Sequence, residues 1–119
     1  MLKAMIVDDE ANARENLRLM LQEYCPDVEV VAAAGSAGEA RKVLDEMDVQ
    51  ALFLDIKMPG EDGLSLARSL NGRELGLVFT TAYDQYALQA FKHNAIDYLE
   101  KPIDPDALIR AVAKLQRLA

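Results

Sequence analysis

Short apolar runs alternate along the chain with longer segments in which apolar residues recur every three or four positions. The short runs are too short for helices and are typical of strands that are buried on both faces of a sheet. The longer segments are typical of amphipathic helices. The predicted strands are Leu2 to Val7, Val28 to Ala33, Ala51 to Asp55, Leu77 to Thr81 and Ala95 to Leu99.

Five helices are predicted after these strands: one from about Ala11 to Tyr24, one opening at Ser36, one starting near Gly63, one from about Gln85 to His93 and a last one after Asp104-Pro105. Each has an apolar face that would lie on the sheet. These faces are Ala13, Leu17, Met20, Leu21 and Tyr24; Ala37, Ala40, Val43, Leu44 and Met47; Leu64, Ala67 and Leu70; Ala87, Leu88 and Phe91; and Leu108, Ile109, Val112 and Leu115.

Residues at the predicted helix ends support these boundaries. Ser36 with Glu39 three positions later is a capping-box pattern, and Asp62 is placed to cap the third helix. Pro59-Gly60 fits the middle of a type II turn before that helix, and Asn71-Gly72 is a typical helix stop. Proline at the first position suits the start of the last helix.

The alternation of strands and helices predicts an α/β fold, with a doubly wound parallel sheet joined by right-handed crossovers. A length of 119 residues suits one domain, residues 1–119. Periodicity does not give the strand order. For flavodoxin-like sheets of this size the common order is 2-1-3-4-5, with the ligand site at the carboxyl ends of strands 1 and 3.

Composition limits the partners. The net charge of −7 disfavours nonspecific binding of DNA or of an anionic membrane by this domain. The chain has no apolar stretch long enough to span a bilayer and no apolar signal segment, so we expect a cytoplasmic protein. Cys25 is the only cysteine, which excludes an internal disulfide, and we interpret it as a packing residue.

Acidic residues follow two strands that the expected order places side by side. Asp8 and Asp9 follow the first strand, and Asp55 ends the third. Two unit charges about 4 Å apart repel by roughly 4 kcal/mol at an effective dielectric constant near 20, so such a cluster must protonate or hold a cation. Oxygen ligands alone favour a hard cation, and Mg²⁺ is the best candidate. The alternative is that these aspartates only cap loops or the start of a helix.

Two further polar side chains fall at the same predicted edge. Thr81 ends the fourth strand with a hydroxyl, and Lys101 follows the fifth with an ammonium. Either could be an ordinary strand or surface residue. Together with the acids and a cation they would complement a phosphoryl group, with Asp55 as the central acid.

The chain resembles the receiver domain of a two-component response regulator. The motifs that carry the resemblance are Val7-Asp8-Asp9-Glu10, Leu54-Asp55-Ile56-Lys57-Met58-Pro59-Gly60, Thr81-Ala82 and Lys101-Pro102. The likeness covers the whole chain and implies a CheY-like fold. The run from Thr80 to Ile103 further resembles receivers of the LytTR (LytR/AlgR) class, in which a separate DNA-binding output domain follows; here it would lie beyond Ala119.

The resemblance also implies roles for single residues. Asp55 would be the phosphoacceptor that takes a phosphoryl group from a sensor histidine kinase. Asp9, Asp55 and the backbone carbonyl of Lys57 would bind Mg²⁺ directly, and Asp8 mainly through water. Lys101 would pair with Asp55 or with the phosphoryl oxygens, across a cis bond to Pro102.

The same resemblance implies a switch. Thr81 would move to the phosphoryl group and Tyr98 would swing inward behind it. We further expect Tyr83, two positions after Thr81, to screen the phosphoryl group partly from water. The domain would not be an enzyme beyond promoting its own phosphorylation and dephosphorylation.

The readout face would be helix 4, strand 5 and helix 5. Its charged residues could pair across a two-fold homodimer, or could be an ordinary solvated surface. They are Lys92, Arg110, Lys114, Asp97 and Glu100.

Three other functions compete with the phosphoacceptor. A flavodoxin-like FMN carrier would need a phosphate-binding loop where the acids Asp8 and Asp9 stand. A phosphatase of the haloacid dehalogenase kind would need an acid where Lys57 stands. A pseudo-receiver that acts only as a protein-protein interaction module is the remaining alternative.

Overall fold

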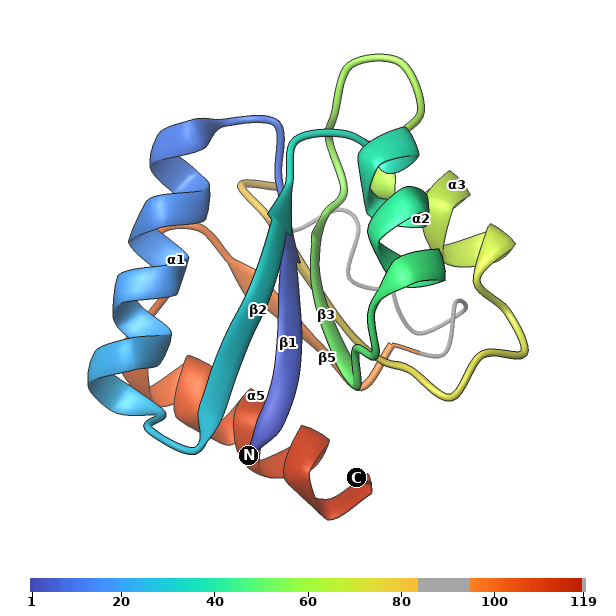
Figure 1. The fold of residues 1–119 in the computed structure, drawn as a ribbon. Helices are drawn as coiled ribbons and strands as arrows, with labels where there is room; N and C mark the ends of the chain where they lie inside the picture. Colours follow the sequence, from blue (N-terminus) through green and yellow to red (C-terminus); the bar gives the residue numbers. More distant parts are fainter. Residues whose placement is uncertain (84–94, 119) are drawn as a thin grey trace.

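The sheet has the strand order expected for a flavodoxin-like fold. The structure is a computed structural model that describes residues 1–83 and 95–118. Its five strands pair in parallel in the order β2-β1-β3-β4-β5 (Figure 1). They are β1 (Leu2–Val7), β2 (Val28–Ala34), β3 (Ala51–Asp55), β4 (Gly76–Thr81) and β5 (Asp97–Glu100).

Helices cover both faces of the sheet. Among the described residues there are four: α1 (Ala11–Tyr24), α2 (Ala37–Glu46), α3 (Gly63–Ser69) and α5 (Pro105–Leu118). Helices α1 and α5 lie on one face, and α2 and α3 on the other (Figure 1). The helix predicted from Gln85 to His93 lies outside the described residues. No helix in the described ranges is both long and apolar enough to cross a membrane.

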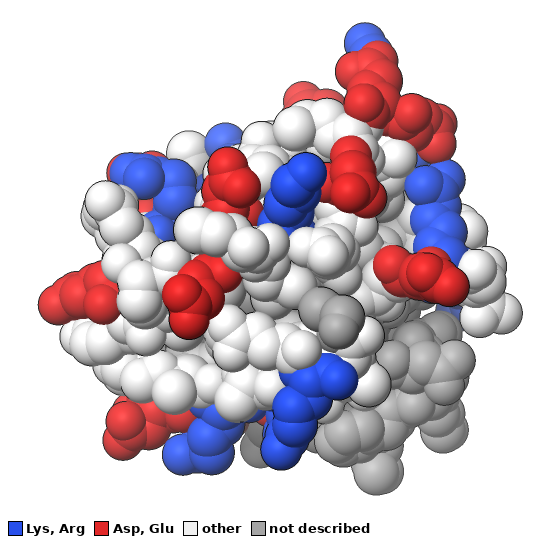
Figure 2. All heavy atoms as spheres, turned by 60° about the horizontal axis from the view of Figure 1, so that its bottom comes forward, with Lys and Arg blue, Asp and Glu red and all other residues white. Residues whose placement is uncertain are grey.

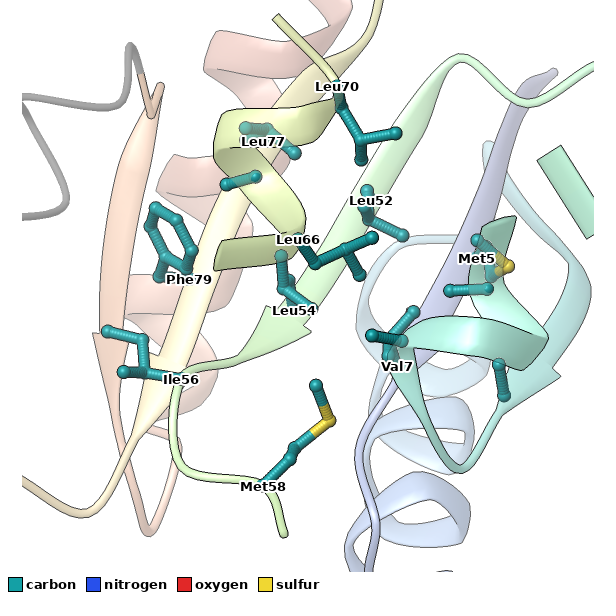
Figure 3. Close-up of a cluster of buried hydrophobic side chains, with 14 of the residues drawn as sticks. Met5, Val7, Leu52, Leu54, Ile56, Met58, Leu66, Leu70, Leu77 and Phe79 are labelled. Carbon is teal, nitrogen blue, oxygen red and sulfur yellow. The ribbon is translucent and has the colours of Figure 1, made fainter. Parts of the chain in front are cut away.

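The core has two layers, one on each face of the sheet. Figure 3 shows the layer under α2 and α3, where Leu66 lies beside Leu54 and Phe79 belongs to the same buried cluster. Phe53 points to the other face and packs in the layer that includes Leu108. Because successive side chains of a strand point to opposite faces, β3 supplies both layers, and all five of its residues are buried.

Side-chain caps start α2 and α3 as predicted. Ser36 Oγ accepts a hydrogen bond from the Glu39 N–H at 3.2 Å. The Glu39 carboxylate accepts from the Gly35 N–H at 2.9 Å, one residue before the position that the capping box assumes. Asp62 Oδ1 accepts from the Ser65 N–H at 2.8 Å. The short local bonds therefore fix where both helices begin.

The remaining turn and cap signals are also confirmed. Gly60 has φ of 75° and Gly72 has φ of 95°, the left-handed region that glycine adopts without strain. Asp104 Oδ2 accepts from the Ala107 N–H at 3.0 Å and so caps α5. Cys25 is buried, which agrees with a packing role.

Some predicted boundaries were wrong by one or two residues. Strand β5 begins at Asp97 rather than Ala95 and ends at Glu100 rather than Leu99. The Ile96 N–H still donates to the Leu77 carbonyl at 2.7 Å, outside the regular ladder. Strand β2 reaches Ala34, and β4 begins one residue before Leu77.

Three residues assigned to buried helix faces are exposed. Tyr24 and Met47 lie at helix ends, and Ile109 is 42% exposed. Helix α5 buries Leu108 and Val112, among others, and Ile109 lies about 100° around the helix from Leu108. The buried face of α5 is therefore narrower than the predicted face, which wrongly included Ile109.

The face that holds both chain ends is mixed in charge. Figure 2 shows this face, where acidic and basic side chains are interspersed around a largely uncharged centre. The polar cluster described next lies at the opposite edge of the sheet, where the strands end (Figure 1).

Candidate functional site

The strand register brings the predicted polar residues to one edge of the sheet. Val7 is opposite Leu54 in the β1–β3 pair, so Asp8 follows beside Asp55. The β3–β4 pair sets Asp55 opposite Thr80, and Thr81 pairs with Glu100, directly before Lys101. The sheet thus collects residues that are up to 93 positions apart in the sequence.

Lys101 lies between two buried carboxylates. Its Nζ is 2.6 Å from Asp8 Oδ2 and 3.5 Å from Asp55 Oδ1. Both carboxylate side chains are 5% exposed, whereas the lysine side chain is 24% exposed. The resemblance paired Lys101 with Asp55, but its shorter contact is with Asp8. One ammonium thus partners two buried carboxylates and offsets part of the cost of burying their charge.

Burial and charge shift the pKa values of this cluster. Desolvation raises the pKa of Asp55 to about 6, and the neighbouring charges of Asp8 and Asp9 act in the same direction, while Lys101 opposes them. Burial alone would lower the pKa of Lys101, but its hydrogen bond to Asp8 and the charge of Asp55 outweigh burial and raise it. Within residues 1–83 and 95–118, the carboxylates of Asp8, Asp9 and Asp55 thus outnumber the one ammonium that contacts the buried pair.

The loop after β1 is held by its own hydrogen bonds. Asp8 Oδ1 accepts from the Glu10 N–H at 2.9 Å, and Arg14 Nη1 donates to the Asp8 backbone carbonyl at 2.7 Å. Asp8 therefore does form a local turn, through its Oδ1 atom, as the alternative interpretation proposed. Its other carboxylate oxygen, Oδ2, contacts Lys101. At the start of helix α1, the N-cap residue Glu10 makes no side-chain capping hydrogen bond.

An acidic group at this loop offers oxygen ligands to a metal ion. One carboxylate oxygen each from Asp8, Asp9 and Glu10 lies within 4.8 Å of the others. Oxygen donors with net negative charge fit Mg²⁺. Asp55 is outside this group, although Asp9 contributes to its raised pKa. Glu10 was not among the predicted ligands, and its only signal in the sequence is that it continues the acidic run.

The loops beside Asp55 are joined through Tyr83. Thr81 is fully buried, and its Oγ1 accepts from the Tyr83 N–H at 3.2 Å. The Tyr98 hydroxyl donates to the Tyr83 carbonyl, and Lys57 Nζ lies 5.4 Å from the centre of the Tyr83 ring. The Lys101–Pro102 bond is cis, as the resemblance implied. The predicted movements of Thr81 and Tyr98, and the role of the Lys57 carbonyl, stay predictions.

Comparisons with known proteins agree on one family. The family model for the response regulator receiver domain matches residues 4–113. An uncharacterized response regulatory protein of Vibrio cholerae is 44% identical over 118 residues, which are 98% of this chain and 49% of the relative. The transcriptional regulatory protein BtsR of Escherichia coli is 43% identical over 118 residues, with the same shares. The chain thus spans about half the length of these curated relatives.

Solved structures show the same fold. The response regulatory domain of mrkE from Klebsiella pneumoniae superposes with a TM-score of 0.88 at 31% identity, covering 98% of this chain and 96% of that one. The receiver domain of AraT from Geobacillus stearothermophilus has a TM-score of 0.85 at 36% identity, covering 98% and 93%. The response regulator TrrA of Thermotoga maritima, solved in complex with Mg²⁺-BeF, has a TM-score of 0.84 at 32% identity, covering 97% and 99%.

Proposed function

The chain belongs to the response regulator receiver domain family, and from this premise we propose that Asp55 accepts a phosphoryl group from a sensor histidine kinase. The observation that supports this most is the position of Asp55. It ends the central strand β3, is 4% exposed, and lies within 3.5 Å of the only ammonium that contacts it among the described residues.

The proposed reaction is an in-line transfer. A carboxylate oxygen of Asp55 attacks the phosphorus of a phosphohistidine, a P–O bond forms, and the P–N bond breaks as the imidazole leaves. Lys101 is placed to offset the charge on the phosphoryl oxygens, and Thr81 can donate its hydroxyl to one of them. Asp9, Asp55 and the Lys57 carbonyl would hold Mg²⁺ directly, with Asp8 mainly through water. The bound ion would supply further positive charge at the transferred group.

The output of the domain is a second part of the proposal. The homologous BtsR proteins are named transcriptional regulators and are about twice as long as this chain. We therefore propose that phosphorylation controls an attached DNA-binding domain, of the LytTR class, in a cytoplasmic protein. The switch would be a population shift carried by Thr81 and Tyr98.

The proposed readout face is the one formed by helix 4, β5 and α5. Lys114 Nζ on α5 lies 3.1 Å from Asp97 Oδ2 on β5, so these two residues pair within one chain. A homodimer through this face would have to exchange or extend that pair. Lys92, which was predicted to join them, lies outside the described residues.

Intact-mass measurement tests the phosphoacceptor. The wild type is incubated with acetyl phosphate and Mg²⁺, beside Asp55→Asn, which keeps the shape of the side chain but removes its charge. Asp45→Asn, an exposed aspartate on α2, is the matched control. We expect one phosphoryl adduct on the wild type and on the control, and none on Asp55→Asn.

The other outcomes separate the rival functions. An adduct of equal yield on Asp55→Asn would contradict the assignment of Asp55. A wild type that binds Mg²⁺ but takes no phosphoryl group from acetyl phosphate or from a phosphorylated kinase domain would support the pseudo-receiver. Repeated release of phosphate from a phosphomonoester substrate would support a phosphatase.

A further inference from the structure

Arg41 on α2 is bonded to the loop that follows Asp55. Its Nη1 donates to Glu61 Oε1 at 2.6 Å, and its Nη2 donates to Glu61 Oε2. This is a bidentate pair, the geometry in which a guanidinium binds a carboxylate most strongly. The same guanidinium also donates to Ser69 Oγ, with Nη2 at 2.9 Å and Nε at 3.3 Å. Arg41 therefore joins three segments: α2, the loop of residues 56–62, and α3.

Further bonds fix Glu61. The Ser65 hydroxyl donates to Glu61 Oε2 at 3.0 Å, and the Ser69 hydroxyl donates to the Leu66 carbonyl at 2.7 Å. The hydrogen bonds from Arg41 and Ser65 lower the pKa of Glu61 to about 2. The pair is about one-third exposed, with 36% for Arg41 and 33% for Glu61. A single exposed ion pair contributes little to stability, but a bidentate pair with added hydroxyl donors restricts the geometry of the loop.

The end of this loop touches its beginning. The Gly63 N–H donates to the Ile56 carbonyl at 2.8 Å, which closes the base of the loop. A Cβ atom at Gly63 would lie 2.2 Å from the carbonyl oxygen of Asp55, so the first residue of α3 lies directly against the backbone of Asp55. A shift of Glu61 or of the first turn of α3 would therefore also displace the backbone of Asp55 and Lys57, because Gly63 contacts both Asp55 and Ile56.

We propose that the Arg41–Glu61 pair positions the loop of residues 56–62 and thereby sets the Mg²⁺ affinity of the site and the lifetime of the phosphoryl group on Asp55. This inference rests on the phosphoacceptor function proposed above. Neither residue contacts the reacting atoms, so both are positioning residues. Without the pair, the loop that carries the Lys57 carbonyl samples more conformations, which weakens the metal site and admits water to the acyl phosphate.

The chain offers a matched control on the same helix. Arg73 Nη2 and Asp45 Oδ1 are 3.0 Å apart, and this pair also ties α2 to a loop. It has one hydrogen bond, its side chains are 45% and 67% exposed, and it lies near the end of α2 that is remote from Asp55. Removing it therefore tests the loss of an α2 ion pair without disturbing the loop of residues 56–62.

The experiment compares Arg41→Ala, Glu61→Gln and Arg41→Lys with Arg73→Ala. Mg²⁺ affinity is measured by titration calorimetry, and the half-life of the phosphorylated form by intact mass after acetyl phosphate is removed. We expect Arg41→Ala and Glu61→Gln to lose about tenfold in Mg²⁺ affinity, with a half-life shortened severalfold. Arg41→Lys keeps the charge but not the bidentate geometry, so its values should fall between wild type and Arg41→Ala. Arg73→Ala should match the wild type.

Each other outcome has a defined meaning. Mg²⁺ affinity and half-life within twofold of the wild type in both Arg41→Ala and Glu61→Gln would overturn the inference. An equal loss in Arg73→Ala would also overturn it, because the effect would then follow general loosening of α2. A wild type that neither binds Mg²⁺ nor takes a phosphoryl group would instead refute the proposed function. If Arg41→Ala does not fold, Glu61→Gln and Arg41→Lys decide the question.

Discussion

Replacing Asp55 by asparagine should stabilise the metal-free protein at neutral pH. Asparagine has nearly the shape of the protonated carboxyl group but carries no charge at any pH. The Asp55 side chain is 5% exposed, and burial, together with Asp8 and Asp9, makes its ionisation unfavourable in the folded state. In the unfolded chain the same group ionises freely. The folded wild type therefore bears a free-energy cost at neutral pH that Asp55→Asn does not.

The size of the effect follows from the pKa shift. The pKa of Asp55 rises from 3.8 to about 6 on folding. One unit corresponds to about 1.4 kcal/mol, so the full cost is about 3 kcal/mol. Below both pKa values the group is neutral in the folded and unfolded states, and no cost remains. Between them the unfolded chain loses its proton first, so the folded state binds more protons and the stability of the wild type falls as the pH rises.

Chemical unfolding in EDTA at several pH values measures this difference in the free energy of unfolding between Asp55→Asn and the wild type. The free energy of unfolding of Asp55→Asn should exceed that of the wild type by about 1.5 kcal/mol near pH 5 and by about 3 kcal/mol near pH 8. The second value corresponds to a midpoint of thermal unfolding raised by about 10 °C for a domain of this size. Asp45→Asn, with a side chain 67% exposed, should stay within about 0.5 kcal/mol of the wild type. A difference between Asp55→Asn and wild type that is zero, or that does not change with pH, would refute the reasoning.

Three further predictions, two of them with a control substitution, test features of the fold and site. Gly63→Ala should destabilise the protein by about 2–3 kcal/mol, because the added methyl group would collide with the Asp55 carbonyl. Gly38→Ala is its control: a Cβ atom there would meet no neighbouring atom within 4 Å, so the change should be neutral or stabilising by about 0.5 kcal/mol. Denaturant unfolding measures both effects. Ser36→Ala removes the cap of α2 and should lower the free energy of unfolding by about 1 kcal/mol. Tyr83→Ala should speed loss of the phosphoryl group with little change in thermal stability, since the side chain is 49% exposed, and Tyr83→Phe should retain the wild-type rate. An unchanged dephosphorylation rate in Tyr83→Ala would reject the screening role.

Local patterns predicted the strands, and the strand order common to such sheets predicted which site residues gather at one edge. Asp8, Asp55 and Thr81 stand at the end of apolar runs and Lys101 lies two residues after Leu99, and parallel strands place all their carboxyl ends at one edge. The pattern does not determine which charged groups meet at that edge. Lys101 Nζ lies closer to Asp8 than to Asp55. Which carboxylate it contacts depends on how the loops after β1, β3 and β5 are placed in three dimensions.

The contact between Arg41 and Glu61 left no signal in the sequence. Arg41 and Glu61 are separated by 20 positions, and other Arg and Glu residues have the same local character. The hydrophobic pattern also did not predict where β5 starts. Ala95 and Ile96 are apolar, but the regular hydrogen-bond ladder to β4 begins only at Asp97. In both cases the deciding interaction comes from a distant segment, as tertiary context outweighs local preference.

The cost of Asp55 to the fold has a consequence for function. A cluster in which one ammonium faces two buried carboxylates, with Asp9 nearby, is less stable than a neutral one of the same shape. A cation that binds only the folded state stabilises it according to its concentration and affinity, by about 2.7 kcal/mol at one hundred times the dissociation constant. Mg²⁺ should therefore raise the unfolding midpoint of the wild type more than that of Asp55→Asn. The buried negative charge that makes the metal-free site unfavourable would also favour the binding of a divalent cation.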